Sequence, residues 1–273
     1  MATKFIKYEK ALLKIADQSI MAESAELGVE ASLQPITNVT GSLVRYAPSS
    51  PVKGTLSFSH YCTGAFHDFL NPLTAIEHTG EPVEGSLAGV TFSSGYIKSL
   101  SFSVSPFSPI LFKSQMDIYG ELQAPSPSLT EVLDNEGQTD NLLRNERNVS
   151  HGLKTYMAGT DIGVNKKVSF DYSVSCSRNP VVTVGNELPS RVTKEDVRIS
   201  LSIAGEDIGE AIGITGNYAA LNINVFDAYG NTALANFGCT GQIFNQNLSV
   251  SEGGYIDGTV SASQEYLTGR VFY

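Results

Sequence analysis

Val52-Lys-Gly-Thr-Leu-Ser-Phe58 indicates the fold class, because apolar or small residues alternate with polar ones along its length. This period of two is typical of a strand with one buried face, since successive side chains point to opposite sides of a sheet. The stretch Val197-Arg-Ile-Ser-Leu-Ser-Ile203 repeats the pattern. The inward positions are Val52, Gly54, Leu56 and Phe58 in the first stretch, and Val197, Ile199, Leu201 and Ile203 in the second. The two stretches predict equivalent strands of an all-β fold.

An internal repeat extends this relationship along the chain. Sliding the sequence by 145 residues lays Ser24–Ser59 on Ser169–Ala204 without a gap, with 9 identities in 36 positions. A second block, Gly95–Ile110, lies on Gly241–Ile256 at a shift of 146, with 6 identities in 16 positions. Two blocks in the same order at nearly the same offset predict a duplicated domain. The alternative is two unrelated strand-rich stretches.

The duplication predicts how the chain is organised. Residues 1–122 are expected to form a first β domain and residues 151–273 a second, each closing several short antiparallel strands as a sandwich or barrel. Residues 123–150 are expected to be a linker, because Gln123-Ala-Pro-Ser-Pro-Ser128 is rich in prolines that remove ladder donors. The fold is all-β with minor helix. Short helices are predicted at Leu129–Leu133, Thr139–Arg147, Ala65–Leu70 and Glu206–Ile212.

The charge distribution argues against tight nucleic-acid binding. The net charge is −10, and dividing the chain near Pro125 gives −3 before it and −7 after it. No cluster of Lys and Arg could neutralise a row of phosphates. An acidic surface therefore predicts a protein that repels DNA.

The cysteines and the apolar runs bear on the cellular compartment. Cys62, Cys176 and Cys239 are widely spaced, form no Cys-x-x-Cys pair and are predicted to be buried free thiols. The N-terminal residues lack the apolar run of a signal peptide, and no stretch approaches the ~20 apolar residues of a membrane helix. We therefore expect a protein of a reducing compartment, with no membrane partner.

Catalytic signatures are missing from the sequence. It contains no phosphate-binding loop, no His-Glu-x-x-His helix, no nucleophile elbow and no calcium loop. His60, His67 and His78 fall in one stretch beside Asp68, where a metal site of His67, Asp68 and His78 is the alternative to a solvated loop. Paired carboxylates for glycoside hydrolysis are a further alternative, although the chain has no Trp for a sugar platform. We expect no enzymatic activity, no cofactor and no metal.

Four ordered segments carry a resemblance to a known family. Ala11–Leu27 reads as a strand, a tight turn and a second strand; the others are Tyr46–Tyr61, Gly95–Pro109 and Met116–Gly120. In this order they resemble the opening, the following hairpin and the later core strands of the tailed-bacteriophage tail tube protein family. The match covers about Lys10–Leu122, and more weakly His151–Leu267.

The resemblance implies a structural virion protein of the phage tail, assembled in the host cytoplasm. Tube-like domains of this family join sheet edge to sheet edge into rings, and the rings stack into a channel that conducts DNA without binding it specifically. A chain with two fused domains would fill two of six ring positions, so three copies would close a homotrimeric ring. Its other partners would be tail proteins. The linker Gln123–His151 would bridge neighbouring domains, and Lys53 and Arg198 would lie away from the pore or pair with carboxylates.

The resemblance also suggests one assembly segment. It is the loop that runs through His67, Asp68, Phe69, Leu70, Asn71 and Pro72, which has no counterpart in Ile203–Gly230 of the second half. This departure keeps a baseplate hub or a tail adaptor with tube-like domains as an alternative. A ligand-binding or host-binding β module is an alternative from another class.

Overall fold

The described part of the chain consists of strands. The computed structural model describes residues 13–16, 18–20, 22–61, 82–105, 109–123, 152–157, 160–161, 168–186, 188–206, 218–226, 233–250 and 256–267. These residues contain no helix, and all-β is therefore the fold class, as the alternating pattern predicts. The predicted helices before Glu206 lie outside the described residues. Glu206 itself is wrong as a helix start, because it is the last residue of a long strand.

The first half contributes ten strands. They are β1 (Leu13–Ile15), β2 (Gln18–Ile20), β3 (Ser24–Glu30), β4 (Leu33–Thr37), β5 (Leu43–Pro48), β6 (Lys53–Tyr61), β7 (Val83–Leu87), β8 (Val90–Val104), β9 (Leu111–Ile118) and β10 (Leu122–Gln123). The second half contributes β11 (Gly152–Met157), β12 (Thr160–Asp161), β13 (Val168–Val181), β14 (Arg191–Glu206), β15 (Tyr218–Phe226), β16 (Ala233–Val250) and β17 (Ile256–Leu267).

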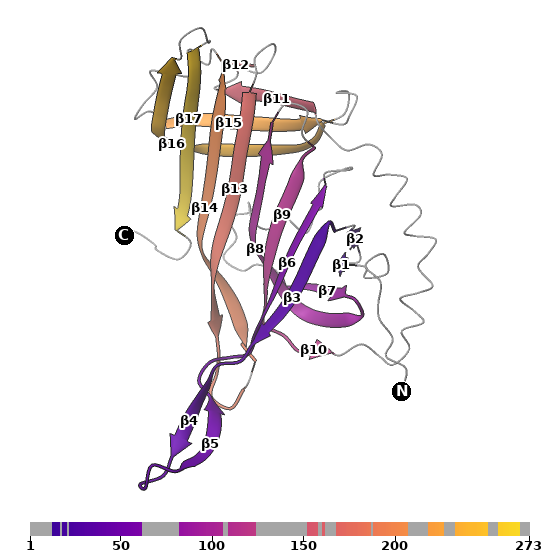
Figure 1. The fold of residues 1–273 in the computed structure, drawn as a ribbon, viewed down its shortest axis with the longest axis vertical. Coiled ribbons are helices and arrows are strands. Elements are labelled where there is room, and N and C mark those ends of the chain that lie inside the picture. The colour runs from indigo at the N-terminus through magenta and orange to yellow at the C-terminus, as the bar shows by residue number, and fades with distance from the viewer. Residues whose placement is uncertain are drawn as a thin grey trace.

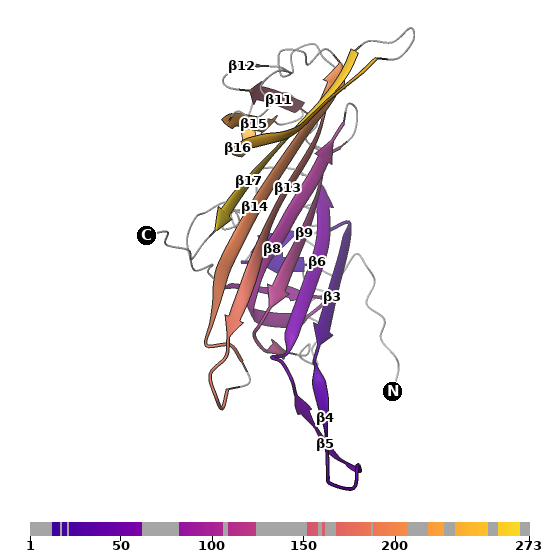
Figure 2. The same ribbon diagram turned by 90° about the vertical axis from the view of Figure 1, so that its left-hand side faces the viewer.

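One antiparallel sheet runs through both halves of the molecule. Its main part has the order β3-β6-β9-β8-β13-β14-β17-β16, and every neighbouring pair is antiparallel. The halves meet where β8 pairs with β13, with Phe170 opposite Val104 and Ser175 opposite Ser99. Figures 1 and 2 show these long strands side by side, with β3 and β16 at opposite sides. We call the β8–β13 pairing the internal joint.

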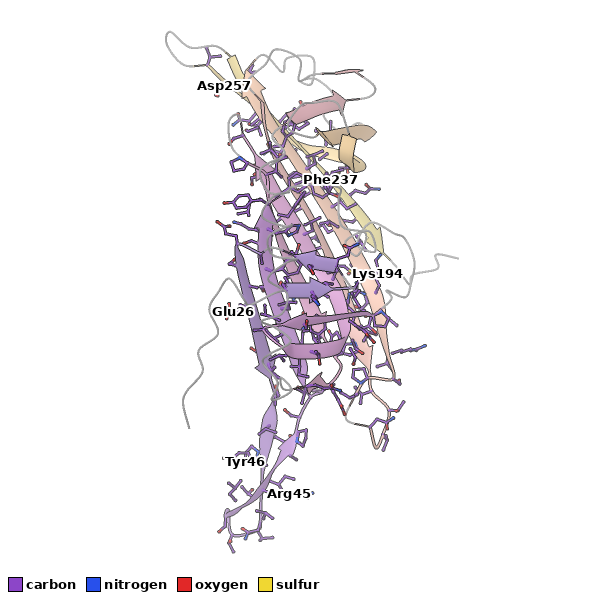
Figure 3. All side chains as sticks on the ribbon, turned by 90° about the vertical axis from the view of Figure 1, so that its right-hand side faces the viewer. Glu26, Arg45, Tyr46, Lys194, Phe237 and Asp257 are labelled. Atoms are coloured by element: carbon purple, nitrogen blue, oxygen red, sulfur yellow. The ribbon has the colours of Figure 1, made fainter. Side chains whose placement is uncertain are left out.

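A second layer covers one face of this main sheet. The first residues of β8 pair with β7 and β10, and the order continues from β7 to β1 and β2. The first part of β16 pairs with β15, from which the order continues to β11 and β12. Figure 3 shows short strands of this layer crossing in front of the main sheet. Each half is therefore a sheet folded over itself by one long strand that changes partners.

Glycines allow the two long strands to change partners. A Cβ on Gly95 of β8 would lie 2.7 Å from the Phe92 ring, and a Cβ on Gly241 of β16 would lie 2.1 Å from the carbonyl oxygen of Ser263. Real Cβ atoms do not approach other atoms so closely. A β-bulge follows each glycine, between Ile97 and Ser99 in β8 and between Ile243 and Asn245 in β16. Bulges bend a strand and increase its twist, which suits a strand that leaves one layer for another.

Strand registers repeat between the halves at the offsets that the sequence alignment gives. Ser24 lies opposite Ser59 in β3 and β6, and their aligned partners Ser169 and Ala204 lie opposite each other in β13 and β14. Phe102 lies opposite Phe112, and Leu248 lies opposite Gly258 at the offset of the second block. The two bulges are separated by that same offset. A duplication of one domain would produce this agreement; the division into domains at 1–122 and 151–273 stays a prediction.

A single buried cluster spans both halves. Phe102 lies at its centre, with ring centroids 5.1 Å from Phe112, 5.3 Å from Tyr172 and 4.6 Å from Phe237. These four rings come from β8, β9, β13 and β16, so the internal joint is packed as a core. The inward set predicted in the second stretch is buried, as are Leu56 and Phe58 in the first; Val52 precedes β6 and is exposed.

Candidate functional site

Figure 2 shows the face of the main sheet that the second layer leaves open. The outward side chains on this face are rich in hydroxyl groups. On β13 the outward side chains are Asp171, Ser173, Ser175 and Ser177, and all four residues are exposed. One row crosses all eight strands, and six of its eight residues are serine: Ser24, Ser59, Lys113, Ser101, Ser173, Ser200, Ser263 and Gln242. We call this surface the hydroxyl face.

Some hydroxyls on this face form hydrogen bonds across strands. The Oγ atoms of Ser24 and Ser59 lie 2.8 Å apart, and those of Ser202 and Ser261 lie 3.0 Å apart. The hydroxyl of Ser103 donates to Asp171 Oδ1 at 2.6 Å across the internal joint. Hydroxyls that already have partners offer little to a passing ligand. The face is therefore polar, but we expect it to bind ligands weakly.

Two of the basic side chains on the hydroxyl face are neutralised by carboxylates. Lys53 Nζ lies 2.9 Å from Asp117 Oδ2, and Arg198 Nε lies 2.7 Å from Glu265 Oε1. The sequence analysis expects Lys53 and Arg198 to lie away from a pore or to pair with carboxylates, and both are paired with carboxylates. Lys113 interrupts the serine row as an exposed cation.

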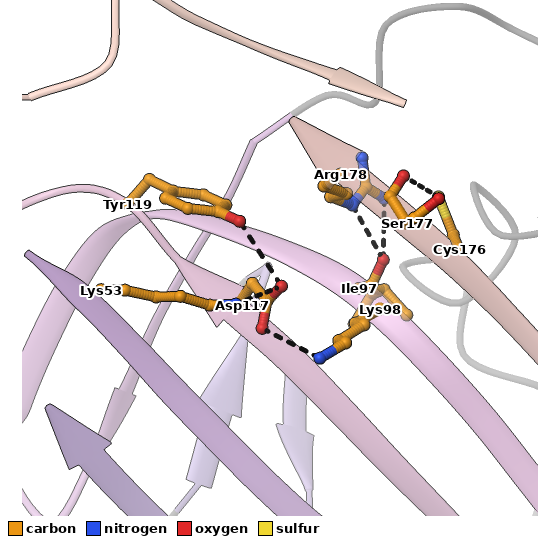
Figure 4. A network of polar contacts seen from close by, with 8 residues as sticks. All are labelled: Lys53, Ile97, Lys98, Asp117, Tyr119, Cys176, Ser177 and Arg178. Carbon is orange, nitrogen blue, oxygen red and sulfur yellow. Dashed lines mark hydrogen bonds and ion pairs between the residues drawn. The ribbon is translucent and has the colours of Figure 1, made fainter. Parts of the chain in front are cut away.

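A polar network lies at one end of the internal joint (Figure 4). Arg178 of β13 donates to the carbonyl oxygen of Ile97 through Nη2 at 2.7 Å and Nε at 3.2 Å. This carbonyl belongs to the bulge of β8. The Arg178 guanidinium also lies 5.1 Å from the centre of the Tyr96 ring. Arg178 therefore fastens the second half to the irregular point of the first.

The carboxylate of Asp117 organises the other side of this network. Besides Lys53, it attracts Lys98 Nζ at 3.9 Å and accepts from the Tyr119 hydroxyl at 3.5 Å. Burial, with the negative charge of Asp117, raises the pKa of Tyr119 to about 12. Burial lowers the pKa of Arg178, which its neighbours Cys176 and Tyr96 partly oppose. The network thus brings one acidic side chain, three basic side chains and the Tyr119 phenol together.

Replacing Arg178 by Ala should lower the free energy of unfolding by about 1.5–3 kcal/mol, the usual contribution of a hydrogen bond from a charged group. The Ile97 carbonyl would lose both of its guanidinium donors. Urea denaturation measures the change. Arg45→Ala, in the exposed β4–β5 hairpin, is the matched control and should change stability by less than about 0.5 kcal/mol. If both variants lost the same free energy of unfolding, the role of Arg178 in connecting the two halves would be contradicted.

Two edges of the main sheet remain open among the described strands. Among the described strands, β3 pairs only with β6, and residues 243–250 of β16 pair only with β17. Both edges carry exposed apolar side chains, Val29 on β3 and Phe244, Leu248 and Val250 on β16. An open edge with apolar side chains is a template for pairing with another chain. These edges are the candidate assembly surfaces.

Two hairpin arms project from one end of the main sheet (Figure 1). The longer arm is β4–β5, whose tip is closed by Asn38 Oδ1 accepting from the amides of Thr40 at 3.1 Å and Ser42 at 2.9 Å. The other arm joins β13 to β14. Val39 and Val184, which are aligned with each other in the sequence repeat, are fully exposed at the two tips. The repeat thus places an exposed valine at the tip of each arm.

The site residues proposed from sequence lie mostly beyond what the structure describes. His67, Asp68, Phe69, Leu70, Asn71 and Pro72 are all outside it, as are Cys62 and His78. His60 is described, and a solvated loop is wrong for it: it lies buried in β6, with its ring centroid 5.9 Å from that of Phe58. Burial in an apolar strand face, which the period-two pattern could have indicated, explains the difference.

Other sequence expectations concern thiols, metals and membranes. Cys176 and Cys239 are buried free thiols, as predicted, and burial raises the pKa of Cys239 to about 11. In the described ranges no three His, Cys, Asp or Glu side chains gather as metal ligands do. Within those ranges there is also no helix of the length and hydropathy that a membrane span requires.

Sequence reasoning missed the hydroxyl face, although its signal is present. Serine occupies alternate positions in Ser99, Ser101 and Ser103, and again in Ser173, Ser175 and Ser177. A strand whose outward residues are all small hydroxyls differs from an ordinary solvated strand, which carries long charged side chains. No protein-family model matches the chain, and neither does any curated protein.

Proposed function

We propose that this protein is a structural subunit that assembles into rings and stacked tubes, and that it forms the DNA-conducting tube of a phage tail. The hydroxyl face between two open sheet edges is the observation that supports this most. Neither the edges nor the face suits catalysis, because the described residues there contain no convergent set of acid, base and nucleophile. A sheet that extends by edge pairing is suited to assembly.

The strand directions favour a closed ring of identical chains. The main sheet has eight antiparallel strands, so its two edge strands, β3 and β16, run in opposite directions. Copies related by a rotation about an axis along the strands would therefore meet in antiparallel pairing, the same type as every other pair in the sheet. Ring closure would pair both free edges of the main sheet. With two related units per chain, three chains would fill six positions.

The hydroxyl face has the chemistry of a lumen wall for duplex DNA. Serine hydroxyls are short and uncharged, and some of them bond to neighbouring strands, so they offer phosphates few strong contacts. Lys53 and Arg198 are paired with carboxylates, and the chain carries a net charge of −10. A wall that holds phosphates weakly allows DNA to move along it, because tight phosphate binding needs clustered cations.

The hairpin arms would connect one ring to the next. Both project from the same end of the sheet, along the direction in which rings would stack (Figure 1). Their exposed valines, Val39 and Val184, would be buried against the adjacent ring. Burying apolar tips stabilises stacking at roughly 25 cal/mol for each Å² of apolar surface removed from water.

Electron microscopy of the purified full chain should show rings or tubes with a central hole wide enough for duplex DNA. Mass measurement after chemical cross-linking should give three chains in each ring, because two units per chain fill six positions. Six chains per ring would contradict the two-unit arrangement. A solid filament, or a protein that stays monomeric at high concentration, would contradict the tube itself.

A further inference from the structure

The internal joint gives the geometry of a junction between two units. Across it Val104 lies opposite Phe170, Ser103 opposite Asp171, Phe102 opposite Tyr172 and Ser101 opposite Ser173. Its apolar residues alternate with the residues of the hydroxyl face. β8 supplies one side and β13 the other. The open edges are the sequence counterparts of these two strands, because the repeat aligns β16 with β8 and β3 with β13.

The sequence repeat gives a counterpart for every residue of the internal joint. Each residue pair of that joint therefore corresponds to a pair of edge residues, one from each of two neighbouring copies. Val104 and Phe170 become Val250 and Ala25; Phe102 and Tyr172 become Leu248 and Leu27; Ser101 and Ser173 become Asn247 and Gly28. The hydrogen-bonded pair Ser103 and Asp171 becomes Ser249 and Glu26, which again places a hydroxyl opposite a carboxylate. The apolar pairs at Val250 and Leu248 and the hydroxyl–carboxylate pair are thus retained, whereas Leu100 and Val174 become Gln246 and Val29.

Exposure of the counterpart residues shows what the open edges lack. Val174 is 1% exposed in the internal joint, whereas its counterpart Val29 is 54% exposed at the β3 edge. Phe102 is 2% exposed and Val104 is 4% exposed, whereas Leu248 is 50% and Val250 is 70% exposed at the β16 edge. Apolar side chains are present at both edges, and no other strand of the described ranges covers them.

We infer that β16 of one copy pairs with β3 of the next in the register of the internal joint, with Asn247 opposite Gly28 and Leu248 opposite Leu27 of the neighbouring copy. The occupant of each edge is thus a second copy of this chain, and the inference rests on the proposed self-assembly. The pairing continues the hydroxyl face across the junction, because Ser249, Asn247 and Asn245 fall on that face. A slip of one residue would bring the polar set inward and is excluded by burial.

The junction between copies lacks one feature of the internal joint. The counterpart of Arg178 is Leu33, an exposed residue that cannot donate to a bulge carbonyl. The carbonyl of Ile243, which corresponds to that of Ile97, receives no guanidinium from the neighbouring copy. The junction between copies is therefore the weaker of the two, and rings should separate into intact chains before the chains unfold.

A disulfide test reads the register directly. The full chain carrying both Asn247→Cys and Gly28→Cys is assembled and then oxidised. Directly opposite residues lie within the roughly 7 Å between Cα atoms that a disulfide requires. We expect covalent dimers and trimers on non-reducing gels, with the ladder ending at the closed ring. The matched control, Asn247→Cys with Ser24→Cys, moves one thiol four residues along β3, about 13 Å, and should form no such ladder.

The outcomes separate the register from the assembly. Rings in the microscope without cross-links in the first variant would overturn the register and leave the tube proposal standing. A ladder in the Ser24→Cys control would also overturn it. If the unmodified protein forms no rings and the first variant forms no cross-linked oligomers, both the register and the tube proposal are overturned. Leu248→Asp should raise the concentration needed for half association by at least about tenfold, since it buries a charge, while circular dichroism shows the chain still folded.

Discussion

Phe102→Ala is expected to lower the free energy of unfolding by about 3–5 kcal/mol, the cost of removing a large aromatic side chain from a packed core. The Phe102 ring lies 4.6 Å from that of Phe237 and 5.1 Å from that of Phe112, centroid to centroid. Phe237 belongs to the second half and Phe112 to the first. The cavity would therefore open between the halves, where both lose contacts together.

Urea unfolding followed by tyrosine fluorescence and by far-ultraviolet circular dichroism measures this effect. Both probes should report one shared transition at lower urea, because a single buried cluster spans the two halves. Ser101→Ala, one position away on the open face, is the control and should shift stability by less than about 0.5 kcal/mol. Two separate transitions in the unmodified protein would show that the halves unfold as independent cores.

Gly241→Ala is expected to destabilise the protein by about 3 kcal/mol, near the upper end of the cost of overpacking. A Cβ there would lie 2.1 Å from the carbonyl oxygen of Ser263 and 2.7 Å from its carbon. Both atoms belong to the backbone of β17, so the clash can be relieved only by separating β16 from β17. These are strands of the main sheet, at the point where β16 leaves it.

Thermal and urea unfolding of Gly241→Ala should be compared with Gly28→Ala. A Cβ on Gly28 has no atom within 4 Å, so that variant should be neutral or slightly stabilised. Gly95→Ala, at the counterpart position in β8, should fall between them, because its nearest neighbours are the flexible ends of Phe92 and Met116. Equal stability of Gly241→Ala and Gly28→Ala would mean that β16 has room to shift.

The strand pattern could be predicted from sequence because each half-buried strand carries its own period-two signal. Val197, Ile199, Leu201 and Ile203 are buried as predicted. The offsets between the repeated blocks could also be read, since they depend only on matching residues. The hairpin in Ala11–Leu27 is present as β1 and β2, joined through Ala16 in a left-handed conformation at φ 48°.

Other features depend on contacts that no local pattern specifies. The pairing of β8 with β13 joins strands that are far apart in the sequence. No residue pattern within either strand indicates which strand it will pair with. The partner change in β16 depends on the space around Gly241, which the sequence shows only as one glycine among 25. His60 was grouped with His67 and His78 by proximity in sequence, whereas its burial is set by Phe58 and Phe112.

In the tube that we propose, the two hairpin arms would affect how successive rings are aligned. The β4–β5 arm forms its own two-stranded sheet, whereas the other arm is a continuation of β13 and β14, so the two tips differ in shape. In a ring of three chains, long and short tips would alternate around the circumference. A neighbouring ring could then dock in three rotational orientations. A ring with six identical tips would allow six such orientations. Fusing two units in one chain would thereby halve the number of ways in which successive rings can be rotated against each other.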